Sequence, residues 1–152
     1  MNYADTSFIA AAYAVDVNTP EARRYMAEEE PRLPFTFLHW PEVAKALWTN
    51  HPAKAEAVWD ELKGALADGQ TLYRLQLDAD AVAQRAAGLM RHYAHRWPKL
   101  RAIDVMHVSA AVECHAKTFL SFDTRSYQRV LAHTQKLKVW PAITSEEAAH
   151  LK

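Results

Sequence analysis

The chain has 152 residues, half of them apolar, with equal numbers of acidic and basic side chains. This length predicts a single domain over residues 1–152 with a sizeable core. Three glycines disfavour a turn-rich all-β fold, and one cysteine excludes an intramolecular disulfide and disfavours a thiolate metal site. There is no basic-then-apolar leader and no run of about 18 apolar residues, so we expect a cytoplasmic protein without a membrane segment.

Short apolar runs alternate with helix-like segments along the whole chain. Apolar, β-favouring runs predict strands just before Asp5 and at residues 33–38, 71–75, 118–122 and 137–140. Caps, prolines and helical spacing predict helices at residues 8–13, 20–30, 41–48, 53–67, 79–97, 104–112 and 125–133, and a short one from 145. Strands separated by helices predict an α/β fold with a parallel sheet covered on both faces.

Four acidic side chains recur where strands end or helices begin. Asp5 and Asp123 end apolar strands, whereas Glu42 and Asp104 open helices. Each has a structural explanation, because Asp5, Asp104 and Asp123 can cap helices and Glu42 can favour its helix through the macrodipole. If the sheet brings these ends together, four carboxylates face one crevice and repel one another. Oxygen ligands alone would then favour Mg²⁺ or Mn²⁺ over Zn²⁺.

The charges are distributed unevenly along the chain. Acidic side chains outnumber basic ones in residues 1–80, and the reverse holds in residues 81–152. Every charged residue from Arg85 to Arg101 is Lys or Arg, and this segment leads into Asp104. Phosphate contacts from Arg96, Lys99 and Arg101 are one interpretation, which would position RNA beside the acids. A solvated basic helix end is the equally good alternative.

Four segments resemble, in order, the motifs of the PIN-domain family. Tyr3-Ala4-Asp5-Thr6-Ser7-Phe8 resembles the opening motif, and Pro41-Glu42-Val43 resembles the Glu-bearing helix start. The third motif is similar to Ile103-Asp104-Val105-Met106-His107-Val108-Ser109-Ala110-Ala111. The fourth motif is similar to Phe119-Leu120-Ser121-Phe122-Asp123. The resemblance covers nearly the whole chain, and the length is typical of VapC-like toxins from toxin–antitoxin pairs.

The resemblance implies a single PIN-like α/β domain, with a parallel sheet of about five strands in the order 3-2-1-4-5 and helices on both faces. It implies a Mg²⁺- or Mn²⁺-dependent endoribonuclease that acts on RNA, is blocked by a cognate antitoxin protein, and often forms a homodimer. The catalytic residues would be the acidic quartet, which comprises Asp5, Glu42, Asp104 and Asp123.

Roles within the quartet also follow from the resemblance. Asp5, Asp104 and Asp123 would be metal-binding residues, with Asp5 and Asp104 the most direct ligands. Glu42 and Asp123 would orient metal-bound water or a second metal ion. Thr6 or Ser7 would hydrogen-bond a ligated water or a carboxylate.

Two other functions compete with this interpretation. A catalytically silent PIN-like module would bind RNA or protein only, although it has no need of a complete quartet. A phosphotransfer or receiver-type acid pocket would require a second acid beside Asp5, where Thr6-Ser7 stands instead.

The remaining candidates have favoured structural explanations. His107 lies one turn after Asp104 and is better explained as a helix-face histidine than as a group that positions Asp104 or a phosphate. His92 and His95 have metal-binding spacing but no evident third ligand. The tryptophans at 40, 48 and 59 belong either to the core or to an apolar groove for a partner helix.

Overall fold

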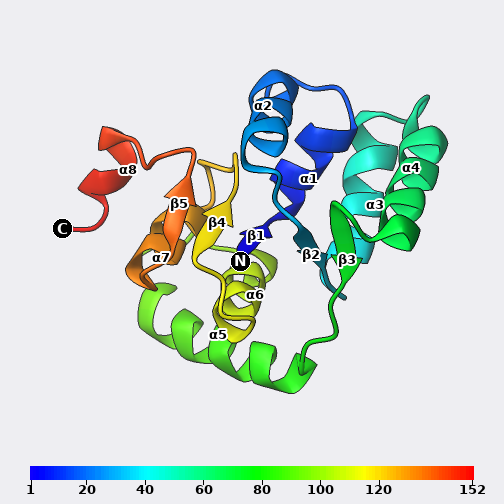
Figure 1. The fold of residues 1–152 in the computed structure, drawn as a ribbon. Coiled ribbons are helices and arrows are strands. Elements are labelled where there is room, and N and C mark those ends of the chain that lie inside the picture. Colours follow the sequence, from blue (N-terminus) through cyan, green and yellow to red (C-terminus); the bar gives the residue numbers. More distant parts are fainter. The chain divides into compact units, whose positions relative to one another are not determined.

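The computed structural model describes residues 1–152, which divide into two compact units, unit 1 (residues 1–76) and unit 2 (residues 77–152). Unit 1 contains β1 (Asn2–Ala4), α1 (Thr6–Tyr13), α2 (Thr19–Glu29), β2 (Leu33–Phe35), α3 (His39–Asn50), α4 (Ala55–Asp68) and β3 (Leu72–Arg74). Unit 2 contains α5 (Ala79–Tyr93), α6 (Ala102–Glu113), β4 (Thr118–Leu120), α7 (Gln128–Thr134), β5 (Lys138–Trp140) and α8 (Ser145–Ala149) (Figure 1). This order of strands and helices confirms the one that the sequence predicts.

The strands pair in parallel, as the α/β pattern requires. In unit 1, β2 pairs with β3, and Leu33 lies opposite Leu72. In unit 2, β4 pairs with β5, and Phe119 lies opposite Val139. Hydrogen bonds divide the strands between two sheets, so the single five-stranded order 3-2-1-4-5 stays a prediction. The single domain over residues 1–152 also stays a prediction.

Several elements are shorter than their sequence patterns suggest. β2 ends at Phe35 because the hydroxyl of Thr36 accepts the backbone N–H of Leu38, at 3.3 Å, and turns the chain toward α3. α5 ends at Tyr93 rather than at residue 97, since the amide of Trp97 bonds back to the carbonyl of Tyr93 in a closing turn. Local hydrogen bonds, which apolar patterning does not encode, therefore set these boundaries.

Each unit has a core built on its strands. In unit 1, α1 packs against α2, α3 and α4, and fully buried side chains include Tyr3, Phe8, Leu33, Leu47 and Leu72. In unit 2, α6 packs against α5 and α7, and the buried set includes Val105, Val108, Phe119, Leu120 and Leu131. Burial of one such side chain contributes about 1.5–3 kcal/mol to folding. None of the helices is long and apolar enough to cross a membrane.

Candidate active site

Asp5 stands between β1 and α1 and caps the helix. Its Oδ1 accepts the backbone N–H of Phe8 at 3.0 Å and the hydroxyl of Ser7 at 2.6 Å. The Asp5 backbone is extended, and the residue is only 4% exposed. The predicted cap is confirmed, and it places a nearly buried carboxylate where the helix macrodipole favours negative charge.

Thr6, the residue after Asp5, carries an orphaned polar atom. Its Oγ1 is buried and has no hydrogen-bond partner, the one such side-chain atom in the structure. Leaving a buried hydroxyl unsatisfied costs about 1–3 kcal/mol, so it calls for an explanation. A ligand or water bound beside Asp5 would supply the missing partner.

Glu42 lies in the first turn of α3, as predicted. The helix begins earlier than expected, at His39 instead of Pro41, because the amide of His39 bonds the carbonyl of Thr36 at 3.1 Å and closes a turn there. Glu42 is half-buried. Its position one turn inside the helix leaves the carboxylate favoured by the helix dipole without making it the cap.

The imidazole of His39 connects the start of α3 to the end of β1. Its Nε2 lies 2.8 Å from the carbonyl oxygen of Ala4, and its Nδ1 accepts the backbone N–H of Thr36 at 2.8 Å. These two bonds require a neutral ring with its proton on Nε2. The ring is fully buried and stacks on Phe35 with centroids 5.0 Å apart. His39, which the sequence analysis did not single out, thus ties together the elements that carry Asp5 and Glu42.

Asp104 lies in the first turn of α6 and binds a guanidinium. The helix begins at Ala102 with Arg101 as its N-cap, so the prediction that Asp104 caps this helix is wrong. Arg101 donates from Nε to Oδ2 at 2.8 Å and from Nη2 to Oδ1 at 3.0 Å. Asp104 is 2% exposed, so this two-pronged contact places a positive charge against a nearly buried carboxylate.

Asp123 follows β4 in a loop and also does not cap a helix. α7 begins at Gln128 instead of residue 125, because the Asp123 carboxylate holds the next three residues in a turn. It accepts the backbone N–H of Arg125 and the hydroxyl of Ser126, both at 2.9 Å. Nη2 of Arg101 lies 3.7 Å from its Oδ2. Asp104 and Asp123, which are distant in sequence, therefore converge on one guanidinium.

Gln128 and Ser121 link the backbone of Asp104 to that of Asp123 through hydrogen bonds. The hydroxyl of Ser121 accepts the backbone N–H of Asp123 at 3.1 Å and donates to Oε1 of Gln128 at 3.2 Å. The Gln128 amide then donates to the carbonyl of Asp104 at 3.3 Å. All of these contacts are buried or partly buried. The sequence offered no pattern that pointed to Gln128, because the link spans three separate elements.

The chemistry of these groups fits a hard divalent cation. Unit 1 carries Asp5, Glu42 and the orphaned hydroxyl of Thr6, and unit 2 carries Asp104 and Asp123. Carboxylate and hydroxyl oxygens are the donors that Mg²⁺ and Mn²⁺ prefer. Neither unit gathers three or more acidic, histidine or cysteine side chains into a metal-binding group. In unit 2, the Arg101 guanidinium stands where a bound cation would neutralise the two carboxylates.

Comparison with known proteins identifies the fold. No protein-family model and no curated protein matches this chain. Among solved structures, it is similar to the crystal structure of VapC20 from Mycobacterium tuberculosis, a toxin that cleaves the sarcin-ricin loop. The TM-score is 0.65 over 82% of this chain and 92% of VapC20, at 17% sequence identity. This chain has the PIN-domain fold of a VapC toxin.

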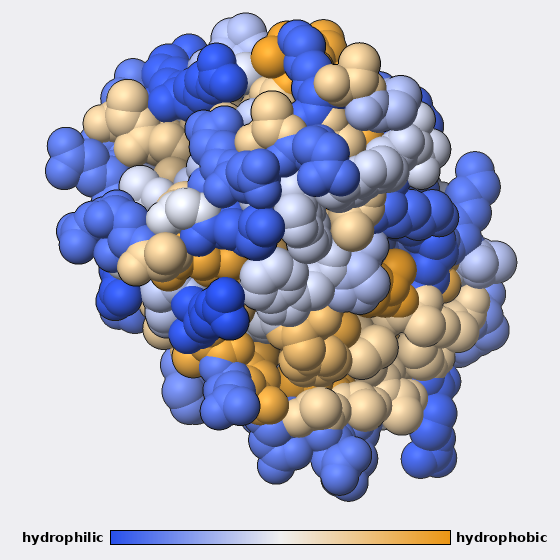
Figure 2. All heavy atoms as spheres, turned by 90° about the vertical axis from the view of Figure 1, so that its right-hand side faces the viewer, coloured by the Kyte–Doolittle hydropathy of each residue, from blue (hydrophilic) through white to orange (hydrophobic).

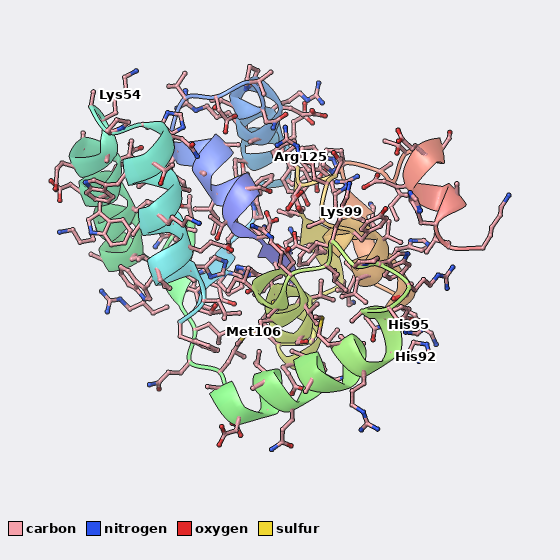
Figure 3. All side chains as sticks on the ribbon, turned by 180° about the vertical axis from the view of Figure 1, so that it is seen from behind. Lys54, His92, His95, Lys99, Met106 and Arg125 are labelled. Carbon is pink, nitrogen blue, oxygen red and sulfur yellow. The ribbon has the colours of Figure 1, made fainter.

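The three predicted phosphate-binding residues differ in whether their charges are already engaged within the protein. Nη2 of Arg96 donates to the carbonyls of His150 and Lys152, at 2.8 and 2.6 Å, and so binds the C-terminal residues. Arg101 is engaged with the acids. Lys99 is exposed, forms no ion pair, and lies on the connection between α5 and α6 (Figure 3). Of the three predicted phosphate-binding residues, Lys99 has its charge least compensated within the protein.

The histidine candidates differ in burial. His107 is fully buried within α6. His92 and His95 are exposed near the end of α5 (Figure 3). The ring of His92 packs edge-on against Tyr93 at 4.6 Å. Because no third ligand gathers with His92 and His95, the structure provides no metal group there.

The three tryptophans of unit 1 form one aromatic cluster that reaches the surface. Trp59 packs edge-on against Trp40 at 5.6 Å and against Trp48 at 5.7 Å, and Trp48 is 41% exposed. Figure 2 shows the side of the molecule on which α3 and α4 lie, where polar and apolar side chains are mixed. The cluster is therefore only partly buried.

Proposed function

We propose that this protein is a Mg²⁺- or Mn²⁺-dependent endoribonuclease, the toxin of a type II toxin–antitoxin pair. The reaction is hydrolysis of an RNA phosphodiester bond by the quartet of Asp5, Glu42, Asp104 and Asp123. The convergence of Asp104 and Asp123 on one guanidinium carries the proposal, because it gathers two predicted ligands around a positive charge. The VapC-like fold supports it independently.

The residues of the quartet have separate roles in this proposal. Asp5, Asp104 and Asp123 hold the cation, while Glu42 and Asp123 orient the attacking water. The hydroxyl of Thr6 gains its missing partner from that water. When bound, the cation supplies Lewis-acid stabilisation of the phosphate and lowers the pKa of water. Lys99 contributes a phosphate contact that positions RNA without reading its sequence.

The decisive experiment is an RNA cleavage assay with purified protein and Mn²⁺ or Mg²⁺. The substrates are a broad RNA set that includes a sarcin-ricin-loop hairpin, chosen because VapC20 cleaves that loop. We expect cleavage that EDTA abolishes and that falls at least about 100-fold in Asp5→Asn and Asp104→Asn, since both lose a ligand charge. Asp60→Asn is the matched control, because Asp60 is exposed on α4 and pairs only with Lys63.

Each outcome of the assay has a clear meaning. Circular dichroism and thermal melting establish that the variants stay folded. Cleavage that persists in both quartet variants would remove the acids from the mechanism. RNA retention without metal-dependent cleavage would instead favour the second candidate, a catalytically silent PIN-like binding module. The exposed Lys99 supports this second candidate, because a lysine can bind RNA phosphates whether or not the protein cleaves RNA.

The toxin role has its own test in cells. Induced expression of the wild-type chain should arrest growth, and expression of Asp104→Asn should not. Co-expression of the protein encoded by an adjacent small open reading frame should restore growth by acting as the cognate antitoxin. Sedimentation of the purified toxin then tests the proposed homodimer.

A further inference from the structure

Arg101 makes the most unusual ion pair in unit 2. One guanidinium contacts both oxygens of Asp104, at 2.8 and 3.0 Å, and reaches Asp123 at 3.7 Å. The Arg101 side chain is 62% exposed, whereas the side chain of Asp104 is 4% exposed. A solvated cation on a flexible stem therefore neutralises a carboxylate that is itself almost buried.

The Arg101 guanidinium contacts the same carboxylate oxygens that a metal ion would bind. Carboxylate oxygens bind a hard cation through their lone pairs, and both Asp104 oxygens already accept N–H bonds from Arg101. A guanidinium keeps its charge at all accessible pH values, so deprotonation cannot remove it. A divalent cation and Arg101 thus compete for one carboxylate and repel each other when both are close.

Asp104 and Asp123 are held in place independently of Arg101. The carbonyl of Asp104 accepts the amide of Gln128, and Asp123 is fixed by bonds with Ser121, Arg125 and Ser126. The two carboxylates would keep their backbone positions if the guanidinium swung away. Because the Arg101 side chain is exposed, its guanidinium would be hydrated after it leaves the carboxylate, and this lowers the cost of the movement.

A second arginine in unit 2 shows the opposite design. Arg129 is 3% exposed, pairs with Glu147 at 2.8 Å, and donates further bonds to the carbonyls of Ser121, Pro141 and Ala142. Release of this side chain would leave three carbonyls and a buried carboxylate without their donor. Arg129 is therefore fixed by buried partners, whereas the Arg101 side chain is mostly exposed.

We propose that Arg101 is a resident counter-ion, which the divalent metal must displace from Asp104 and Asp123 in order to bind. The proposal rests on the proposed function, because it takes these two acids as metal ligands. Competition with Arg101 sets the metal affinity. In the metal-free protein, the same contact neutralises the acid pair.

The test is calorimetric titration of the RNA-free protein with Mn²⁺. We expect Arg101→Gln to bind Mn²⁺ about three- to tenfold more tightly than the wild type, since the competitor and its repulsion are both removed. Arg101→Lys keeps the charge but not the two-pronged geometry, and its affinity should lie between those two. Arg91→Gln is the matched control, because it removes the same charge from an exposed arginine on α5 that forms no ion pair with the acids. Its Mn²⁺ affinity should stay within about twofold of the wild type.

Unchanged or weaker Mn²⁺ binding by a folded Arg101→Gln variant would overturn the proposal. If that variant does not fold, Arg101→Lys decides, and equal or weaker binding there overturns it as well. Asp104→Asn separates this inference from the proposed function. If Asp104→Asn loses Mn²⁺ binding but the Arg101 variants do not bind Mn²⁺ more tightly, the counter-ion proposal alone is wrong. If Asp104→Asn binds Mn²⁺ as the wild type does, Asp104 is not a metal ligand, and both the counter-ion proposal and the proposed function are overturned.

A second readout follows the arginine itself. In the wild type, the Nε–H resonance of Arg101 should be displaced from the position of free arginine by its bond to Asp104. Saturation with diamagnetic Mg²⁺ should return it to the free position, while the Nε–H resonance of Arg129 stays unchanged. A resonance of Arg101 that does not move at Mg²⁺ saturation would contradict displacement.

Discussion

At the scale of single residues, the acids differ in what holds them. Asp5 is fixed by the first turn of its own helix, through bonds to Phe8 and Ser7. Asp123 is fixed by the turn through Arg125 and Ser126, and the Asp104 carbonyl is bound by Gln128 of α7. Arg101, the N-cap of the helix that carries Asp104, contacts both carboxylates. Substitution of Asp5 by Ala would therefore remove a helix cap, worth about 1 kcal/mol, in addition to the proposed metal ligand. This is why isosteric Asn, which can still cap, is the appropriate replacement in the cleavage assay.

Thr6→Val tests the orphaned hydroxyl. Because the Thr6 Oγ1 has no partner, we expect the free energy of unfolding to stay the same or rise by about 1 kcal/mol. Metal-dependent cleavage should fall about tenfold, since the variant cannot bond the ligated water. Urea unfolding and the cleavage assay measure the two effects.

Ser7→Ala is the comparison, because it removes the hydrogen bond from the Ser7 hydroxyl to Asp5. This change should lower the free energy of unfolding by about 0.5–1.5 kcal/mol. A similar loss of stability in Thr6→Val would show that the Thr6 hydroxyl has a partner in the folded protein.

At the scale of elements, the C-terminal helix α8 braces the loop that carries Asp123. Thr144 and Glu147 form a reciprocal capping box at its start. Glu147 then pairs with Arg129, whose guanidinium also donates to the carbonyl of Ser121 at the end of β4. A short helix of five residues is thus held by a buried ion pair rather than by its own length.

Glu147→Ala should destabilise the protein strongly. The change leaves the Arg129 guanidinium buried without its carboxylate, which costs about 3–5 kcal/mol. Glu146→Ala is the control, because Glu146 is an exposed neighbour in the same turn and should cost less than about 1 kcal/mol. Urea unfolding at neutral pH measures both. Equal effects in the two variants would show that the ion pair contributes nothing to folding.

Acidification should weaken the same brace. Burial raises the pKa of Glu147, but the hydrogen bonds from Arg129 and Thr144 outweigh it and leave the pKa below its usual value of 4.5. A pKa lowered by folding means that the stabilisation is complete above about pH 4.5, the unfolded value, and is lost as the pH falls through the folded value. Unfolding free energies of the wild type and Glu147→Gln should therefore converge below pH 4.5. A gap that is independent of pH would contradict this assignment.

At the scale of the whole molecule, zero net charge conceals a division of charge along the chain. The acidic excess lies in residues 1–80 and the basic excess in residues 81–152. Two of the basic side chains in unit 2 already form ion pairs, Arg85 with Glu113 and Arg129 with Glu147. Fewer basic side chains are therefore available to RNA than the count of lysines and arginines suggests, although the net excess is unchanged.

Lys99→Ala should reduce the salt dependence of RNA binding. Removal of one phosphate contact lowers the slope of log K against log salt by about 1, because fewer counterions are released on binding. Titration of labelled single-stranded RNA in EDTA, in the Asp5→Asn background that we expect to be inactive, separates binding from cleavage. Lys54→Ala is the control, because Lys54 is an exposed lysine at the start of α4 in the acidic half of the chain (Figure 3). An unchanged slope in Lys99→Ala would remove Lys99 from the interface.

The succession of elements and the cap at Asp5 agree between sequence and structure, because apolar periodicity and first-turn chemistry are local. The parallel pairing followed from the alternation of strands with helices. The assignments of Asp104 and Asp123 as caps were wrong, since each side chain meets a stronger nearby donor. For Asp104 that donor is Arg101, and for Asp123 it is the turn through Arg125 and Ser126.

The sequence by itself determined the α/β class and the candidate quartet, because both follow from residue types at local spacings. Only the tertiary structure decided that His39 joins the elements of Asp5 and Glu42, and that Arg101 and Gln128 hold Asp104 with Asp123. It also decided which arginines are already neutralised. These contacts join residues from separate elements, and their partners are chosen by packing geometry, which no local pattern in the chain records.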